Sequence, residues 1–226
     1  MSVTFDNRGT QQKLELISQP SIPTSQRKVG QTAALRVMKR ACDLLIVAAA
    51  APAALLLIAL AGLATLVTSG RPVFFIQKRV GLHGRIFKMV KLRTMANSQS
   101  VLAVATSVQD NRITRVGRLL RIYRIDELPQ LLNVLKGEMS LIGPRPEQPA
   151  LVDEYRRHLP NFDDRHLVKP GITGLAQVMY GYASNLKETR NKLRYDLIYV
   201  RNSSLALEAQ IAVRTVKTVL GCERVR

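Results

Sequence analysis

One apolar stretch decides how this chain folds: Leu44-Leu45-Ile46-Val47-Ala48-Ala49-Ala50-Ala51-Pro52-Ala53-Ala54-Leu55-Leu56-Leu57-Ile58-Ala59-Leu60-Ala61. It opens a longer segment, Leu44–Gly70, that contains no charged residue. About 20 apolar residues are enough to cross a bilayer as a helix. A buried core helix is the ordinary alternative, but core helices are seldom apolar on every side over such a length. The segment therefore predicts a membrane helix, and it begins too far from Met1 to be a secretory signal peptide.

The residues on either side of this segment bear on its topology. Basic residues precede it and follow it, and basic residues beside a membrane segment prefer the cytoplasm. Pro52 removes a backbone donor and biases Ala51 away from helical angles. A straight span with a kink is one reading, and a helix that bends at Ala51-Pro52 and returns to the same face is the favoured one. We therefore predict a re-entrant, helix-break-helix anchor over residues 32–70, and we interpret Lys39, Arg40 and Asp43 as interfacial charges that limit insertion.

The rest of the chain predicts one compact domain over residues 71–226, after a polar, proline-interrupted tail over residues 1–31 that we expect to be disordered. The fold class is α+β, mostly helical with a small β element, and with interfacial amphipathic helices beside the re-entrant one. Two β-like runs, 72–77 and 85–90, flank a turn. The remaining expectations are loops over 95–111 and 169–174 and helices over 115–134 (with a break at Pro129), 149–159, 185–200 and 205–220.

The final helix, residues 205–220, carries a narrow polar stripe of Gln210, Arg214 and Lys217 opposite an apolar face. That face consists of Ala209, Ala212, Val213, Val216 and Leu220. A helix of this kind packs on a core or lies on a membrane surface, and the sequence leaves both possibilities open.

The charge balance restricts the possible partners. The chain has 34 Lys and Arg against 16 Asp and Glu, a net charge of +18 that attracts nucleic acid, anionic membrane or phosphorylated substrates. Aromatic residues are 5% of the chain and Trp is absent, so base-stacking surfaces have little material. Two distant cysteines indicate neither a disulfide framework nor a zinc site. His83, His158 and His166 lack metal-ligand spacing, and we interpret them as surface or substrate-rim residues without a role.

Two adjacent acids, Asp126 and Glu127, stand out in this basic chain. Neighbours on a helix point about 100° apart, so their carboxylates can serve different tasks at one site. One could attack as a nucleophile while the other holds a cation. The ordinary alternative is a pair of carboxylates in the first turn of a helix, where they favour the helix dipole.

The segment Gly143-Pro144-Arg145-Pro146 presents an arginine between two prolines. A planar guanidinium fork is suited to gripping phosphate, and proline rigidity limits the entropy lost on binding. A plain turn with a solvated arginine is the alternative. Lys91 and Arg93 add two cations to one face of a β-like run. Arg145, Lys91 and Arg93 are thus candidate ligands of an anionic group, and the sequence leaves both readings open.

Several motifs occur in an order that is similar to a known family. They are Lys39-Arg40-Ala41-Cys42-Asp43, the proline-broken apolar helix, Phe75–Gly81, Lys91–Met95, Thr114–Gly117, the block Asp126–Pro146 and Lys169–Gly174. The chain thereby resembles the bacterial sugar transferase family over about residues 36 to 221. These are the monotopic polyprenyl-phosphate phosphoglycosyl transferases of the exopolysaccharide-initiating type. The Asp126–Pro146 block is the specific part of the match.

The resemblance implies a defined reaction. Family members transfer a sugar-1-phosphate from a UDP-sugar to polyprenyl (undecaprenyl) phosphate at the cytoplasmic face of the bacterial inner membrane, and release UMP. It implies that Asp126 is the nucleophile of a covalent aspartyl-phosphosugar intermediate and that Glu127, with Asp126, serves Mg²⁺. Arg145, Lys91 and Arg93 would bind phosphate. The expected partners are a UDP-sugar, polyprenyl phosphate and anionic lipid, without nucleic acid, and an oligomer is possible.

The sequence departs from the family at two places. Ala51 stands where the family often has serine before the proline, and the residues after Gly174 lack the usual tryptophan. The alternatives are a basic membrane-tethered nucleic-acid-binding protein and a non-catalytic assembly protein. The acid pair and the constrained arginine favour an enzyme, because a scaffold needs neither.

Overall fold

The computed structural model describes residues 29–96, 112–180, 185–219 and 221. The predicted loop over 95–111 and the predicted tail over 1–31 lie almost wholly outside these residues. Most of the described chain is helical, and four strands form two small sheets, which confirms a mostly helical α+β fold. The elements are α2 (Ala33–Ser69), β1 (Phe74–Val80), η2 (Leu82–Gly84), β2 (Ile86–Leu92), α3 (Arg115–Ile122), η3 (Ile125–Gln130), α4 (Leu131–Leu135), β3 (Ser140–Ile142), α5 (Pro149–His158), η4 (Phe162–Leu167), β4 (Gly171–Thr173), α6 (Leu175–Met179), α7 (Leu186–Asn202) and α8 (Leu205–Val219).

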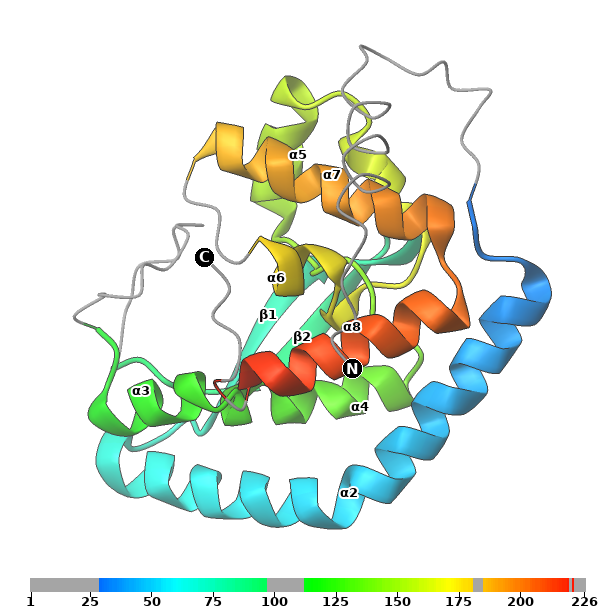
Figure 1. Cartoon of the computed structure of the whole chain (residues 1–226). Helices are drawn as coiled ribbons and strands as arrows, with labels where there is room; N and C mark the ends of the chain where they lie inside the picture. Colours follow the sequence, from blue (N-terminus) through cyan, green and yellow to red (C-terminus); the bar gives the residue numbers. More distant parts are fainter. Residues whose placement is uncertain (1–28, 97–111, 181–184, 220, 222–226) are drawn as a thin grey trace.

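The apolar segment forms α2, a helix of 37 residues capped by the hydroxyl of Thr32, which accepts from the amide of Leu35. Among the described residues, it is the helix whose length and composition suffice to cross a membrane. The helix bends sharply near its middle (Figure 1), where the sequence has Pro52. Helical hydrogen bonding continues through the bend, so the predicted break is a bend within one helix.

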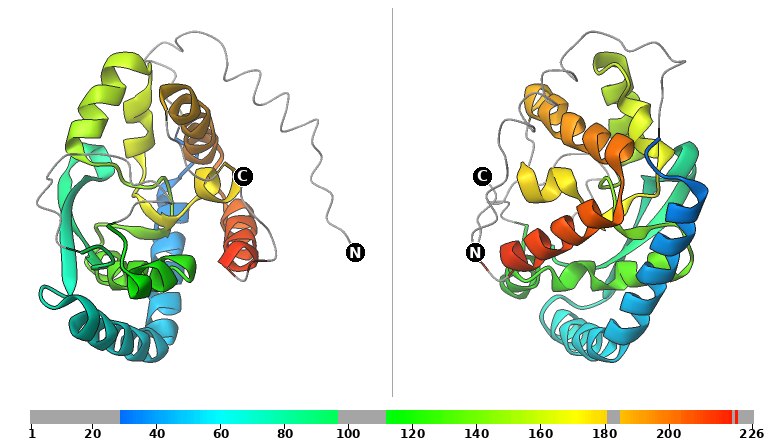
Figure 2. Two further views of the ribbon diagram at one scale, coloured as in Figure 1. Left: turned by 90° about the vertical axis from the view of Figure 1, so that its left-hand side faces the viewer. Right: turned by 45° about the vertical axis from the view of Figure 1, so that its right-hand side comes forward.

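Both halves of α2 pack against the same body. Val47 in the first half joins a cluster that includes Phe87 of β2 and Val134 of α4. Ala61 in the second half joins Leu92 and Leu120. The helix thus runs along two sides of the remaining elements, as Figures 1 and 2 show.

Buried polar contacts fasten the first half of α2 to this body. Asp43 accepts from the hydroxyl of Ser140 at 2.7 Å and from the amide of Leu141 at 3.3 Å. Lys39 forms a 2.5 Å ion pair with Glu208 of α8. The side chains of Asp43 and Lys39 are almost fully buried within the protein.

Arg40, the third of the predicted interfacial charges, also has protein partners. Its guanidinium donates to the carbonyl oxygens of Val134 and Leu135 at 2.6 and 3.0 Å, at the end of α4. A cation at the C-terminus of a helix satisfies orphan carbonyls. The three charged residues therefore dock the helix on the protein, and their position at a membrane interface stays a prediction.

The predicted hairpin is confirmed. β1 and β2 pair antiparallel over their whole length, with Phe75 opposite Lys91. Buried Phe87 and Met89 alternate with exposed Ile86 and Lys88 along β2, as expected for a strand with one face on a core. The hairpin extends between α2 and α5 (Figure 2).

Two local predictions are wrong. The helical region breaks at Arg124, which has a left-handed φ of 57°, while Pro129 lies inside η3. The predicted loop over 169–174 contains strand β4, which pairs in parallel with β3. The close approach there needs glycine, because a Cβ on Gly171 would lie 2.1 Å from the amide nitrogen of Gly143.

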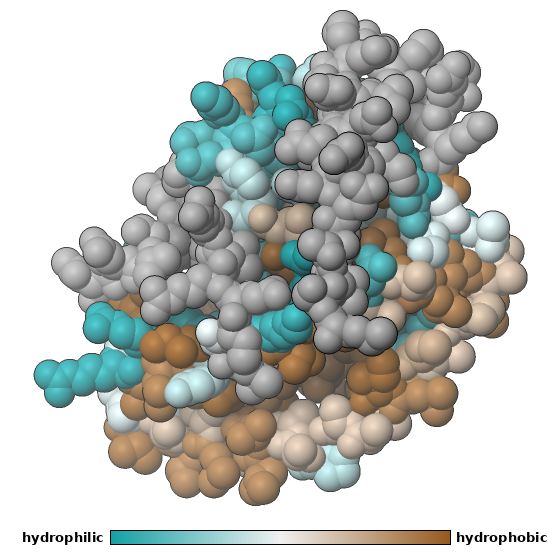
Figure 3. Space-filling view, in the orientation of Figure 1, coloured by the Kyte–Doolittle hydropathy of each residue, from teal (hydrophilic) through white to brown (hydrophobic). Residues whose placement is uncertain are grey.

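The apolar surface follows α2 and α8. Figure 3 shows hydrophobic residues along the edge where α2 runs, and many leucines of α2 are exposed. In α8, Ile211 is buried, whereas Val213 and Val216 are exposed. The predicted apolar face of α8 is thus not the face that packs on the core. Its contact with a membrane surface stays a prediction.

We expect Asp43→Ala to destabilise the protein by about 3 kcal/mol, because it leaves a buried hydroxyl and amide without their charged acceptor. Thermal unfolding of the detergent-solubilised protein measures this loss. Cys42→Ala is the matched control, since Cys42 is an exposed neighbour on the same helix and surface substitutions usually change stability by less than about 0.5 kcal/mol. Equal stability of the two variants would show that the docking contacts contribute little.

Candidate active site

The adjacent acids lie on the short helix η3, which packs against β2. Arg124, which lies between α3 and η3, has a left-handed backbone conformation that changes the direction of the chain at the start of η3. Asp126 and Glu127 are each only 7% exposed. Two carboxylates buried side by side are costly unless cations or donors compensate them, so their partners indicate how the site works.

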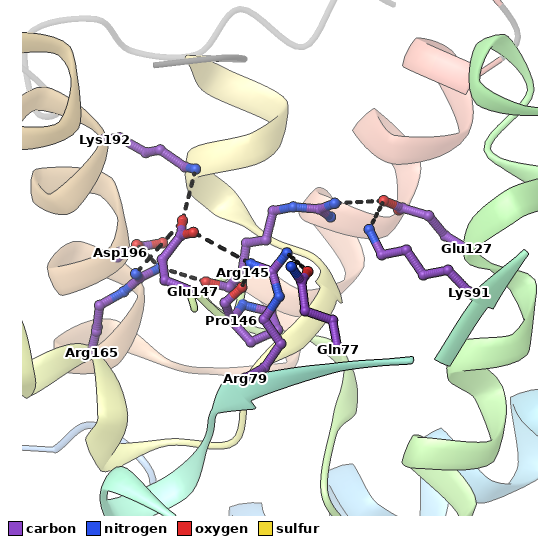
Figure 4. A network of polar contacts seen from close by, with 10 residues as sticks. All are labelled: Gln77, Arg79, Lys91, Glu127, Arg145, Pro146, Glu147, Arg165, Lys192 and Asp196. Carbon is purple, nitrogen blue, oxygen red and sulfur yellow. Dashed lines mark hydrogen bonds and ion pairs between the residues drawn. The ribbon is translucent and has the colours of Figure 1, made fainter. Parts of the chain in front are cut away.

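Glu127 lies among three cations that come from different segments. Its Oε1 atom accepts from Arg145 at 2.6 Å and from Lys91 at 3.3 Å, as Figure 4 shows. Its Oε2 atom lies 3.8 Å from Arg124. Burial raises the pKa of Glu127, but the charges of Arg145 and Lys91 together outweigh burial and hold that pKa well below its usual range. Glu127 is therefore ionised at neutral pH.

Asp126 differs from its neighbour in its partners and in its pKa. Its Oδ1 atom is buried and has no hydrogen-bond partner among the described residues. Burial, and then the charge of Glu127, raise the pKa of Asp126 to about 6. At neutral pH most of its carboxylate is ionised yet poorly compensated, which suits a nucleophile.

Lys91 is the second partner of Glu127. Burial, and then the charge of Arg145, lower the pKa of Lys91 to about 8, against the opposing attraction of Glu127. Lys91 still carries its proton at neutral pH. A cation held in a poorly solvated site interacts strongly with an anionic ligand.

The turn that carries Arg145 is held by residues that the sequence did not indicate. Arg79 of β1 donates to the carbonyl oxygen of Pro146 at 3.0 Å, and Arg165 of η4 donates to that of Arg145 at 2.7 Å. The next residue, Glu147, forms ion pairs with Arg79, Arg165 and Lys192. The position of Glu147 directly after Pro146 was the one feature of the sequence that could have indicated its role. Arg79 and Arg165 look like ordinary isolated charges.

The structure does not bring Arg93 into this group. Its guanidinium donates to the carbonyl oxygens of Gly70 and Arg71 at 2.5 and 3.1 Å, and to that of Ser69. The Arg93 guanidinium thus caps the C-terminal end of α2. Its predicted role in phosphate binding stays a prediction. Ala51 and Pro52 lie in the middle of α2, away from the ends that carry these contacts.

The histidine interpretation is wrong for His166, which is buried rather than superficial. Its Nδ1 atom lies 3.2 Å from Asp163. Burial, followed by the charge of Arg165, lowers the pKa of His166 to about 4, so the ring is neutral.

A divalent cation would find few protein ligands here. Among the described residues, no group of three or more His, Cys, Asp or Glu side chains could hold a metal. Mg²⁺ commonly takes one or two carboxylates and completes its shell with water and substrate phosphate oxygens. The unpartnered Oδ1 of Asp126, beside Glu127, fits a cation of that kind.

Comparison with known proteins identifies the family of this chain. The family model described as bacterial sugar transferase matches residues 34–222. The UDP-N-acetylgalactosamine-undecaprenyl-phosphate N-acetylgalactosaminephosphotransferase of Aeromonas hydrophila is 46% identical over 185 residues, which cover 81% of this chain and 44% of that protein. The UDP-glucose:undecaprenyl-phosphate glucose-1-phosphate transferase of Caulobacter vibrioides is 43% identical over 192 residues, which cover 83% of this chain and 71% of that protein.

A third relative is the undecaprenyl-phosphate galactose phosphotransferase of Salmonella typhimurium, which is 39% identical over 67% of this chain and 34% of its own length. The chain therefore spans less than half the length of the Aeromonas and Salmonella relatives. All three matches exceed the identity at which a shared family is secure, and the family model covers most of the sequence. This chain belongs to the bacterial sugar transferase family.

Proposed function

We propose that the protein transfers a sugar-1-phosphate from a UDP-sugar to undecaprenyl phosphate and releases UMP. The observation that carries the proposal is the pair of unlike carboxylates: Asp126 has an unpartnered oxygen, while Glu127 is neutralised by Arg145 and Lys91. The relatives are named as sugar-phosphate transferases that act on undecaprenyl phosphate. Their names specify N-acetylgalactosamine, glucose and galactose, so the sugar remains to be found by experiment.

In the first half-reaction, the Asp126 carboxylate attacks the phosphorus that bears the sugar. A bond forms between Asp126 and that phosphorus, the bond to the bridging oxygen breaks, and UMP leaves with the electron pair. Repulsion between the carboxylate and the diphosphate opposes this approach. Arg145 and Lys91 reduce the repulsion, because preorganised cations in a poorly solvated site stabilise charge that develops in the transition state.

In the second half-reaction, a phosphate oxygen of undecaprenyl phosphate attacks the same phosphorus. The bond to Asp126 breaks, its carboxylate is regenerated, and a lipid diphosphate sugar is released. This two-step route uses one nucleophile twice, so the lipid acceptor must reach the site that the nucleotide has left. A site held at the membrane surface meets that need.

We further propose that Glu127 and Asp126, together with substrate phosphate oxygens, would hold Mg²⁺. When bound, the ion would neutralise diphosphate charge and so favour departure of UMP. Glu127 already binds Arg145, so a cation at Glu127 would free the Arg145 guanidinium for a phosphate oxygen. Arg145 is suited to both partners, because its fork matches carboxylate and phosphate alike.

We propose that α2 is re-entrant and holds the site at the cytoplasmic face of the inner membrane. A straight helix of 37 residues would be roughly 55 Å long, well beyond the bilayer core of about 30 Å. Asp43 near its start and Ser69 and Gly70 at its end contact the same body of the protein. A helix that crossed the membrane would place these ends on opposite sides, where one body could not contact both.

The experiment that tests the function is a UMP-release screen across UDP-sugars with Mg²⁺ and undecaprenyl phosphate. We expect Asp126→Asn to lower release by about a thousandfold or more, because it removes the nucleophile. Asp153→Asn is the matched control, since Asp153 is exposed on α5. Release by Asp126→Asn at the rate of the control would contradict the assignment.

The pKa values of the site predict a bell-shaped dependence of kcat/KM on pH. Asp126 attacks as a carboxylate, so the rate should rise through about pH 6 as it loses its proton. Lys91 must stay protonated, so the rate should fall above about pH 8. Lys91→Arg should move the alkaline limb upward, because a guanidinium stays charged. An acidic limb near the ordinary aspartate pKa of about 4 would contradict the burial of Asp126.

Thiol labelling in intact cells tests the topology. In a Cys222→Ser background, the exposed Cys42 reports on the start of α2, and Arg71→Cys with Cys42→Ser reports on its end. We expect a membrane-impermeant reagent to label neither site until the inner membrane is permeabilised. Labelling of just one of the two sites in sealed cells would establish a spanning helix instead.

A further inference from the structure

We propose that Arg165 is a positioning residue for catalysis, which fixes the turn that presents Arg145 to the substrate. The inference rests on the proposed function of the site. Arg165 lies on η4, outside the block that contains Asp126 and Arg145, and its ion pairs within the described chain are with Glu147 and Asp196. Its connection to the site runs through the main chain of Arg145.

The terminal nitrogens of Arg165 contact three different residues inside the protein. Its side chain is 3% exposed. One terminal nitrogen donates to the carbonyl oxygen of Arg145 at 2.7 Å and pairs with the carboxylate of Asp196 at 2.7 Å. The other terminal nitrogen lies 4.0 Å from Glu147. The guanidinium also lies over the ring of Phe162, 5.0 Å from its centroid.

A second arginine holds the next residue of the turn. Arg79 donates to the carbonyl oxygen of Pro146 at 3.0 Å and lies 3.6 Å from Glu147. Lys192 of α7 lies 3.5 Å from Glu147. Two successive carbonyls of the turn therefore each accept from a buried guanidinium, and the residue that follows is surrounded by cations (Figure 4).

The sequence of the turn explains why side chains must supply these bonds. Pro144 and Pro146 have no amide hydrogen, so the turn lacks two of the donors with which a loop usually ties its own backbone. The proline rings restrict the φ angles but do not fix where the turn lies relative to Asp126. The backbone amides of Gly171 and Val80 donate to the carbonyls of Pro144 and Glu147. Arg165 and Arg79 restrain the two carbonyls between them, and each joins its carbonyl to a different element.

Folding stability alone does not account for this arrangement. Replacing a buried ion pair by apolar residues of similar volume is often neutral or stabilising, so buried charges are weak evidence for stability. What the charged network adds here is one terminal nitrogen of Arg165 that is held by Asp196 and donates to the carbonyl oxygen of Arg145. A displacement of about 1 Å at a reacting group can cost roughly a hundredfold in rate. This nitrogen is placed to prevent such a displacement of the Arg145 guanidinium.

Arg165→Lys tests the proposal, because lysine keeps a positive charge for Asp196 but lacks the rigid guanidinium plane that lies over Phe162 and aims its terminal nitrogen at the carbonyl oxygen of Arg145. We expect kcat/KM for UMP release, per folded molecule, to fall by about 10- to 100-fold. Arg156→Lys is the matched control, since Arg156 makes an exposed pair with Asp163 beside the same element. The folded fraction is taken from thermal unfolding of each variant.

A double-mutant cycle separates positioning from a general structural role. If Arg165 acts through Arg145, then Arg165→Lys should cost less than about threefold in an Arg145→Lys background, because the group it positions is already lost. An equal loss in both backgrounds, or a kcat/KM equal to that of Arg156→Lys, would overturn the proposal. Should Arg165→Lys not fold, Asp196→Asn is measured in the same two backgrounds with the same criteria.

Failure of the proposed function has a different signature. In that case the wild-type protein itself would release no UMP from any UDP-sugar. An active wild type with an unaffected Arg165→Lys would refute the positioning role alone.

Discussion

The buried carboxylate of Glu127 is the constraint around which the site is assembled. An ionised group at this depth needs compensating charge, and its three cations come from β2, from the residues just before η3, and from the turn after β3. Satisfying one carboxylate therefore brings three segments of the chain together. The same contacts leave Asp126, the adjacent residue, with a free oxygen and a raised pKa. Unequal environments thus give two neighbouring acids different properties.

The large positive charge of the chain has an interior component as well as a surface one. Lys39, Arg93 and Arg165 are buried, and Lys91 is nearly so, each facing carboxylates or carbonyl oxygens of the protein. Net charge read from composition describes an attraction at the surface. Here part of that charge organises helix ends, a turn and a carboxylate pair.

Short-range patterns predicted much of this molecule, and long-range pairing accounts for what they missed. The hairpin follows from alternation along β2, and the acids and Arg145 follow from one compact block. The strands β3 and β4 have three residues each, too few for a period to be visible. Asp196 and Arg165 are single charges 31 positions apart in the printed sequence, and no local pattern links them. Arg93 was assigned to the β-like run, but β2 ends one residue earlier, at Leu92, and alternation could not indicate that the Arg93 guanidinium lies at the end of α2.

The double attachment of α2 has a consequence for how such proteins can diversify. The first half of the helix contributes Val47 to a core shared with β2 and α4, and the second half contributes Ala61 to another. The anchor is consequently not an interchangeable module that recombination could swap between relatives while the catalytic part stays intact. Substitutions on the exposed leucines leave these cores intact, whereas the inward face must change together with the residues it contacts.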